Sequence, residues 1–106
     1  MAEGTRQLGG VGTKVLFEND RVRIWEMDLA PGEESAIHEH ELDYILVQLA
    51  GDRIAGVPEP DTKGYYGEYV EGDVEPGQVF YIEKGGIETA RNIGQERYHE
   101  ILIELK

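Results

Sequence analysis

The chain has 106 residues and carries 22 acidic against 10 basic side chains, which gives a formal net charge of −12. A surface this acidic repels phosphate backbones and anionic lipid, so we expect neither a nucleic acid nor a membrane as a partner. No apolar run approaches the roughly 18 residues of a membrane span. There is no cysteine for a disulfide or a thiolate metal site, and the N-terminus lacks the apolar core of a signal peptide. We therefore expect one cytoplasmic domain with a single core.

Glycine and proline punctuate the chain roughly every ten residues, and the runs between them are rich in Val, Ile, Tyr and Leu. No window of about a dozen residues keeps an uninterrupted helical apolar period. This pattern predicts an all-β sandwich or barrel. In chain order we expect a flexible N-terminal arm over residues 1–12 and one domain over 13–106, with strands at 14–18, 21–30, 35–40, 42–50, 53–57, 65–71, 78–82, 87–93 and 97–105.

The strand predicted over 21–30 alternates regularly, and places Arg23, Trp25, Met27 and Leu29 on one face. We expect this face to fill the barrel, with Trp25 and Met27 as plain core or as walls of a ligand cavity. Tyrosines cluster further on, at Tyr65, Tyr66 and Tyr69. Together with Val22 and Ile24 they offer apolar surface away from the cavity, so we expect a homodimer through sheet edges or faces.

His38 and His40 are two residues apart, and in an extended strand such side chains point to the same face. Tyr44 has the same parity if the strand continues without a bulge, and Gln48 lies further along that face. Two neutral imidazoles side by side are good ligands for a divalent first-row metal. By themselves, two such histidines also fit a surface or hydrogen-bonded structural role.

The glycines around this pair carry a resemblance to a known family. The spacing of this segment resembles the first motif of the cupin superfamily: Gly32, five residues, His38, one residue, His40, three residues, Tyr44, six residues and Gly51. Residues 77–92 resemble the second motif, since Gly77, Gly85 and Asn92 stand in place. The run from about residue 14 to 105 looks most like small single-domain cupins, including the group named after a β-alanine degradation protein.

The resemblance implies a double-stranded β-helix, the cupin jelly-roll barrel, closing two antiparallel sheets over one cavity. It also implies a metal site with two histidines and an acid from the first motif and a third histidine from the second. Only His38 and His40 match that set. Tyr44 stands where the acid is usual, Glu88 stands where the third histidine is usual, and Glu83 replaces the proline of the second motif.

These departures leave two interpretations of the site open. In one, His38, His40 and Glu88 bind Fe, Mn, Ni or Zn as a two-histidine, one-carboxylate set, and Tyr44 donates a hydrogen bond to a ligand. The domain is then an isomerase, lyase or dioxygenase acting on a small polar metabolite. In the other, no metal binds, and His38, Tyr44 and Glu88 act as acid and base in a dehydratase or epimerase.

A third interpretation is a binding module without catalysis, whose cavity holds a small molecule. In all three, we expect Trp25, Met27 and Gln48 to contact the ligand. The fold alone does not choose among these functions, because one barrel supports many chemistries.

Overall fold

The computed structural model describes residues 7–63 and 67–106, and the chain is all-β over these ranges. Short strands rich in β-branched and aromatic residues alternate with Gly-containing turns, as the composition predicts. The described strands are β1 (Lys14–Glu18), β2 (Val22–Leu29), β3 (His38–Glu39), β4 (Tyr44–Ala50), β5 (Arg53–Pro58), β6 (Val70–Asp73), β7 (Val79–Ile82), β8 (Ile87–Asn92) and β9 (Tyr98–Leu105).

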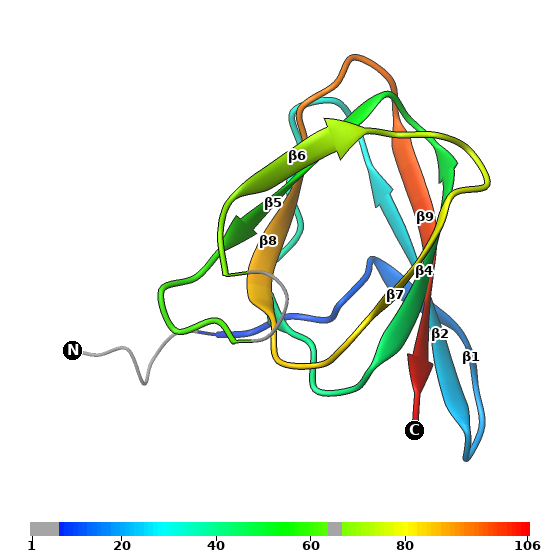
Figure 1. Cartoon of the computed structure of the whole chain (residues 1–106). Coiled ribbons are helices and arrows are strands. Elements are labelled where there is room, and N and C mark those ends of the chain that lie inside the picture. Colours follow the sequence, from blue (N-terminus) through cyan, green and yellow to red (C-terminus); the bar gives the residue numbers. More distant parts are fainter. Residues whose placement is uncertain (1–6, 64–66) are drawn as a thin grey trace.

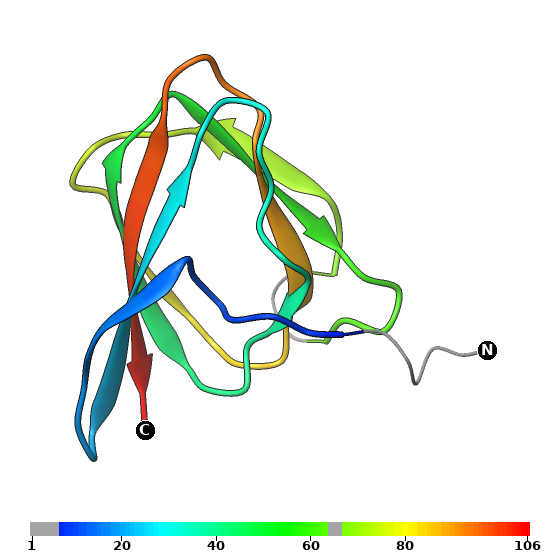
Figure 2. The ribbon, with the colours of Figure 1, turned by 180° about the vertical axis from the view of Figure 1, so that it is seen from behind.

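The strands form two antiparallel sheets that lie face to face, as Figures 1 and 2 show from opposite sides. One sheet has the order β1-β2-β9-β4-β7, and the other has the order β3-β8-β5-β6. β9 lies in the middle of the first sheet and pairs along its whole length with β2 and along most of it with β4. This arrangement confirms the predicted jelly-roll barrel, and it gives every central strand one face toward a shared interior.

Four glycines make the sharp turns of the barrel. Gly32, Gly51, Gly77 and Gly85 have φ values of 84°, 128°, 90° and 118°, and no other described residue has a positive φ. Side chains with a Cβ rarely adopt this backbone conformation, so the turns require glycine. The glycines that the sequence marks as motif positions are therefore the residues that reverse the chain between strands.

The interior is packed as two small apolar clusters. One contains Val11, Tyr44, Ile82 and Leu102, and the other contains Met27, Leu29, Val74 and Tyr98. Val11 belongs to the arm predicted over residues 1–12 but is buried, and the Gly9 backbone N–H donates to the Ile37 carbonyl. The arm is thus packed at its C-terminal end. Residues 1–6 lie outside the described residues, and the domain boundary at residue 13 stays a prediction.

Two predicted strands differ from the structure. The segment 35–40 forms a strand only at β3, because its earlier residues make single hydrogen bonds, such as Ser35 N to Ala90 O, rather than a continuous ladder. The strand predicted at 65–71 is observed at β6, displaced toward the C-terminus. Tyr65 and Tyr66 lie outside the described residues, and Tyr69 is exposed just before β6.

The outer face of the five-stranded sheet carries apolar side chains across neighbouring strands. Ile24, Ile103 and Ile45 are register partners on β2, β9 and β4, and each is half-buried in the single chain. The homodimer expected through sheet edges or faces stays a prediction. Nowhere in 7–63 or 67–106 is there a helix that is long and apolar enough to cross a membrane.

Asn92, the closing residue of the second motif, holds the end of β8 in place. Its buried amide donates to the carbonyls of Leu29 and Glu96, and its Oδ1 accepts from the Gly94 backbone N–H. Removing the amide leaves these backbone groups without partners in the interior.

We predict that Asn92→Ala lowers the free energy of unfolding by about 1–3 kcal/mol, because buried polar groups lose their hydrogen bonds. Urea unfolding followed by circular dichroism measures the change. Asn19→Ala is the matched control: Asn19 also accepts from two backbone N–H groups, but at an exposed turn where water replaces it. Equal losses in the two variants would contradict the structural role of Asn92.

Candidate functional site

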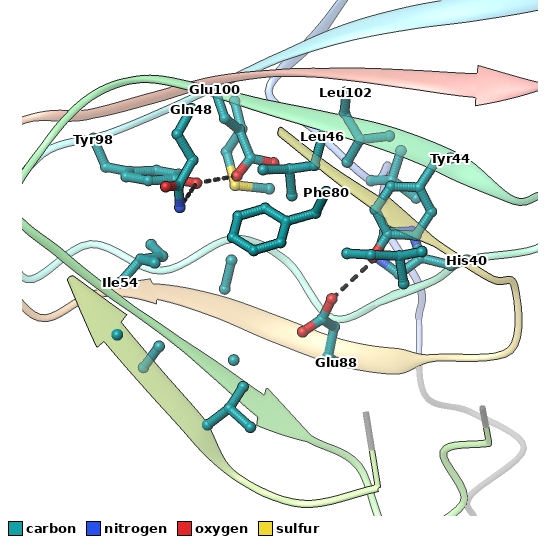
Figure 3. A pocket seen from close by; sticks show the side chains of 18 of the residues that line it. His40, Tyr44, Leu46, Gln48, Ile54, Phe80, Glu88, Tyr98, Glu100 and Leu102 are labelled. Carbon is teal, nitrogen blue, oxygen red and sulfur yellow. Dashed lines mark hydrogen bonds and ion pairs between the residues drawn. The ribbon is translucent and has the colours of Figure 1, made fainter. Parts of the chain in front are cut away.

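A cavity of about 340 Å³ lies between the two sheets. Its walls are largely apolar and include Met27, Leu46, Ile54, Phe80 and Leu102, and Figure 3 shows Phe80 reaching into its centre. The edge strands β6 and β7 also contribute to the lining, and most of their residues are exposed. The cavity therefore opens to solvent between these two sheet edges.

Three buried ligand side chains meet at one end of the cavity. His38, His40 and Glu88 are 1%, 2% and 7% exposed, and each offers a nitrogen or oxygen atom within 4.8 Å of the others. Neighbouring strands bring them together, since His38 on β3 is the register partner of Glu88 on β8. The sequence-predicted set is thus assembled in the structure, and this group could hold a metal ion.

Backbone contacts fix the orientation of the His38 ring. Its Nδ1 lies 2.9 Å from the Ala36 carbonyl oxygen, which can only accept, so Nδ1 carries the proton. Nε2 is then left with its lone pair, 3.9 Å from Oε2 of Glu88. Burial and the neighbouring His40 lower the pKa of His38, so its ring is neutral at pH 7. A neutral imidazole held in one tautomer by a backbone carbonyl is the form in which histidine ligates metals.

His40 lies between Glu88 and Tyr44. Its Nε2 is 3.1 Å from Oε2 of Glu88, and its ring stacks on Tyr44 with centroids 4.2 Å apart. Nδ1 of His40 is a buried atom without a hydrogen-bond partner, the one such side-chain atom in the described part of the chain. Buried polar groups are nearly always satisfied. The unsatisfied nitrogen of His40 is therefore an exception, and it is not the ring nitrogen that contacts Glu88.

The Glu88 carboxylate fits into a space left by a glycine. A Cβ added to Gly56 on β5 would lie 2.9 Å from Oε1 of Glu88, which is closer than real Cβ contacts. Gly56 also lines the cavity. The absence of a side chain at Gly56 therefore lets the Glu88 carboxylate lie against β5.

The residues predicted to contact a ligand divide into two groups. Met27 and Gln48 line the cavity, as does Tyr44. Trp25 is outside this lining: it borders a separate recess, and its indole Nε1 donates to Oε1 of Glu104 at 2.6 Å. The expectation that Trp25 walls the cavity is corrected because the packed arm covers its ring, as the close approach of Gly10 shows.

Two buried polar side chains of the cavity were not identified from the sequence, namely Tyr98 and Glu100 on β9. Burial alternates along this strand, so that Tyr98, Glu100, Leu102 and Glu104 point inward. The outward positions include Ile101, Ile103 and Leu105, so the more apolar face of the strand is the outer one. The alternation of residues separates the two faces of β9 in the sequence. Their apolar content, however, would assign the outer face of β9 to the interior of the barrel.

The two inward glutamates of β9 have different surroundings. Glu104 accepts from Arg23 Nε at 2.8 Å and from the Trp25 indole, so a guanidinium balances its charge. Glu100 accepts from the Tyr98 hydroxyl and has no cation beside it among the described residues. Burial raises the pKa of Glu100 from 4.5 to about 7, although the hydrogen bond from Tyr98 opposes the rise.

No protein-family model matches the chain, and no curated protein matches it. Solved structures do match. A cupin domain from Bordetella pertussis Tohama I is 23% identical, with a TM-score of 0.74 over 97% of this chain and 99% of that one. A Cupin 2 conserved barrel domain protein from Salinispora arenicola CNS-205 is 18% identical, with a TM-score of 0.63 over 88% and 73% of the two chains.

An oxalate oxidase solved in complex with the substrate analogue glycolate also matches, at 21% identity and a TM-score of 0.58. The match covers 77% of this chain and 40% of that one. These likenesses show that the chain has the cupin fold, as its glycine spacing predicts. The subgroup expected from the sequence stays a prediction.

The raised pKa of Glu100 predicts a pH-dependent stability. The folded state holds this proton more tightly than the unfolded state, so the contribution is fully present below pH 4.5 and is lost as the pH rises through about 7. We expect wild-type protein to lose about 3 kcal/mol relative to Glu100→Gln across this window. Urea unfolding of both proteins at several pH values measures the difference.

Tyr98→Phe is the companion variant. It removes the hydrogen bond that lowers the pKa of Glu100, so its stability loss should extend to higher pH than in the wild type. Parallel pH profiles for wild type and Glu100→Gln would show that Glu100 keeps an ordinary pKa.

Proposed function

We propose that this cupin-fold domain is a metal-dependent enzyme, with one divalent first-row ion bound by His38, His40 and Glu88 and a small polar metabolite bound in the adjoining cavity. The observation that carries the proposal is the convergence of three buried ligand atoms within 4.8 Å at the cavity wall. The fixed tautomer of His38, which leaves the lone pair of Nε2 on the side of Glu88, supports it.

The donor set suits a divalent ion. Two neutral imidazoles and one carboxylate leave coordination positions open for water or substrate, and this set accepts Fe, Mn, Ni or Zn. When bound, such an ion polarises a substrate oxygen as a Lewis acid, and iron adds redox chemistry. Isomerase, lyase and dioxygenase reactions on a small oxygen-containing metabolite are the classes that this chemistry serves.

The protein's own side chains have separate roles in this proposal. Glu88 supplies the negative charge, and without the ion its hydrogen bond to His40 holds the two side chains together. Tyr44 is a positioning residue, since its ring stacks on His40 and fixes the plane of the imidazole. The apolar side chains Leu46, Phe80 and Leu102 exclude water from the substrate, and so strengthen the electrostatic interactions at the site.

The 3.1 Å contact between His40 and Glu88 also favours a second candidate. In it no metal binds, Glu88 or His38 removes a proton from the substrate, and Tyr44 returns one, as in a dehydratase or epimerase. Activity that survives chelation and is lost in Glu88→Gln identifies this alternative. A cavity ligand recovered unchanged after long incubation identifies a binding module instead.

We predict that protein purified without a chelator or a histidine tag carries close to one metal ion per chain, as counted by elemental analysis. The double variant His38→Ala, His40→Ala should lose it. Glu88→Gln should bind metal more than about 100-fold more weakly, since even residues that only hydrogen-bond to a metal ligand contribute 10- to 100-fold in affinity. His99→Ala is the control, because His99 pairs with Glu26 at 3.0 Å on another part of the barrel. Wild-type protein that neither carries nor takes up Fe, Mn, Ni or Zn would exclude the metal site.

A second prediction uses the space beside Glu88. Gly56→Ala should fold, because its Cβ meets the movable end of a side chain, but it should displace the carboxylate and weaken metal binding by about tenfold. Competition with a chromophoric chelator measures the affinity. Gly72→Ala lies on the adjacent strand with no atom within 4 Å of the added Cβ, so it should bind metal as the wild type does. Equal affinities for both variants would mean that Glu88 is not a ligand.

A further inference from the structure

A second polar group lies at the end of the cavity away from His40 and Glu88, as Figure 3 shows. Gln48 Nε2 donates to the Tyr98 hydroxyl at 3.4 Å, and this hydroxyl donates to Oε1 of Glu100. The Gln48 Oε1 accepts from the Glu75 backbone N–H at 3.4 Å, so the amide is held at both ends. The three side chains form a directed hydrogen-bond chain that ends at the Glu100 carboxyl.

Packing of the barrel does not account for this series of hydrogen bonds. Glu104, two positions further along the inner face of β9, is matched by Arg23 and Trp25, and so serves packing at the barrel wall. Glu100 is 4% exposed and lines the cavity, with Tyr98 as its donor and no cation among the described residues. Burial of a carboxyl group beside an apolar cavity costs free energy unless a further partner, such as a bound ligand, donates to it.

The charges around the cavity limit which kind of ligand can bind beside Glu100. Over residues 7–63 and 67–106, no lysine or arginine lines the cavity, whereas Glu71, Asp73, Glu88 and Glu100 all do. The first two are exposed and pair with Arg53, and the last two are buried. An anion would therefore meet uncompensated carboxylates. A hydrogen-bond donor, such as a hydroxyl or an ammonium group, complements them.

We propose that Gln48, Tyr98 and Glu100 form a specificity subsite that binds a hydroxyl or amino group of the substrate, through donation to Glu100. This inference rests on the proposed function, because it assigns the reacting end of the same substrate to His38, His40 and Glu88. It names the substrate class as a small, uncharged or cationic molecule with a donor group remote from the reacting atoms.

The placement of the two groups sets the shape of this substrate. On β4, Tyr44 lies beside the histidine end and Gln48 lies at the subsite, four residues further on. Four residues of strand separate their Cα atoms by about 13 Å. A molecule that touches both groups is therefore elongated rather than compact, and it passes the apolar side chains of Leu46 and Phe80 on the way.

Four compounds with a common hydroxyl end test the subsite: 1-hexanol, 1,6-hexanediol, 6-amino-1-hexanol and 6-methoxy-1-hexanol. Protein-detected NMR titration at pH 8 gives a dissociation constant for each, in metal-loaded and in chelator-treated protein. We expect the diol and the amino alcohol to bind at least about fivefold more tightly than hexanol, as one net hydrogen bond provides. The methoxy compound accepts but does not donate, so it should bind like hexanol.

Two substitutions of Glu100 locate the effect. Glu100→Leu should abolish the preference for the diol, and Glu100→Gln should keep it while losing any added preference for the ammonium group. Thermal melts establish that both variants are folded. Glu41→Leu is the control, since Glu41 is exposed and outside the cavity, and it should keep the wild-type preferences.

The outcomes separate this subsite from the metal site. A diol preference that vanishes in Glu100→Leu, with metal content equal to that of the wild type, supports the subsite. Equal affinity of the wild type for hexanol and hexanediol, or a preference that persists in Glu100→Leu, overturns it whatever the metal content. A wild-type protein that binds no metal but keeps the preference overturns the metal site alone.

Discussion

The burial of ionisable side chains in a small barrel is the constraint around which this structure is organised. His38, His40 and Glu88 are almost fully removed from solvent, in a domain where most buried apolar residues of the described ranges lie in two small clusters. Desolvation of such groups is costly unless they hydrogen-bond, lose their charge or bind an ion. The barrel meets the cost by holding His38 neutral on a backbone carbonyl and by setting His40 against Glu88.

Three buried glutamates show three ways of meeting the same cost. Glu104 has a guanidinium and an indole N–H as partners, and acts as part of the wall. Glu88 has two imidazoles as partners, and under the proposed function these would become fellow ligands of a bound ion. Glu100 has a tyrosine hydroxyl and retains its proton up to about pH 7. The cavity thus combines groups of different chemical character on one largely apolar surface, which is typical of binding sites.

The polar groups have precise positions because strand pairing places them. His38 and Glu88 are far apart in sequence, yet they are register partners on β3 and β8. Gln48 on β4 and Glu100 on β9 are register partners in the other sheet. In either pairing, a slip of one residue would turn one member of that pair away from the cavity. The glycine turns that fix the strand lengths, at Gly32, Gly51, Gly77 and Gly85, therefore also maintain the site.

The sequence by itself determined the β class, most of the strands and the His38, His40 and Glu88 set, because glycine turns and alternation are local and the motif spacing is read directly. Met27, Tyr44 and Gln48 line the cavity as predicted, but only the tertiary structure decided the places of Trp25, Tyr98 and Glu100. Trp25 is excluded because the arm, a segment remote from its strand, covers the ring. Tyr98 and Glu100 are included because β9 lies at the centre of its sheet with its polar side inward. Such choices depend on what packs against each face, and that information is carried by residues distant in the chain.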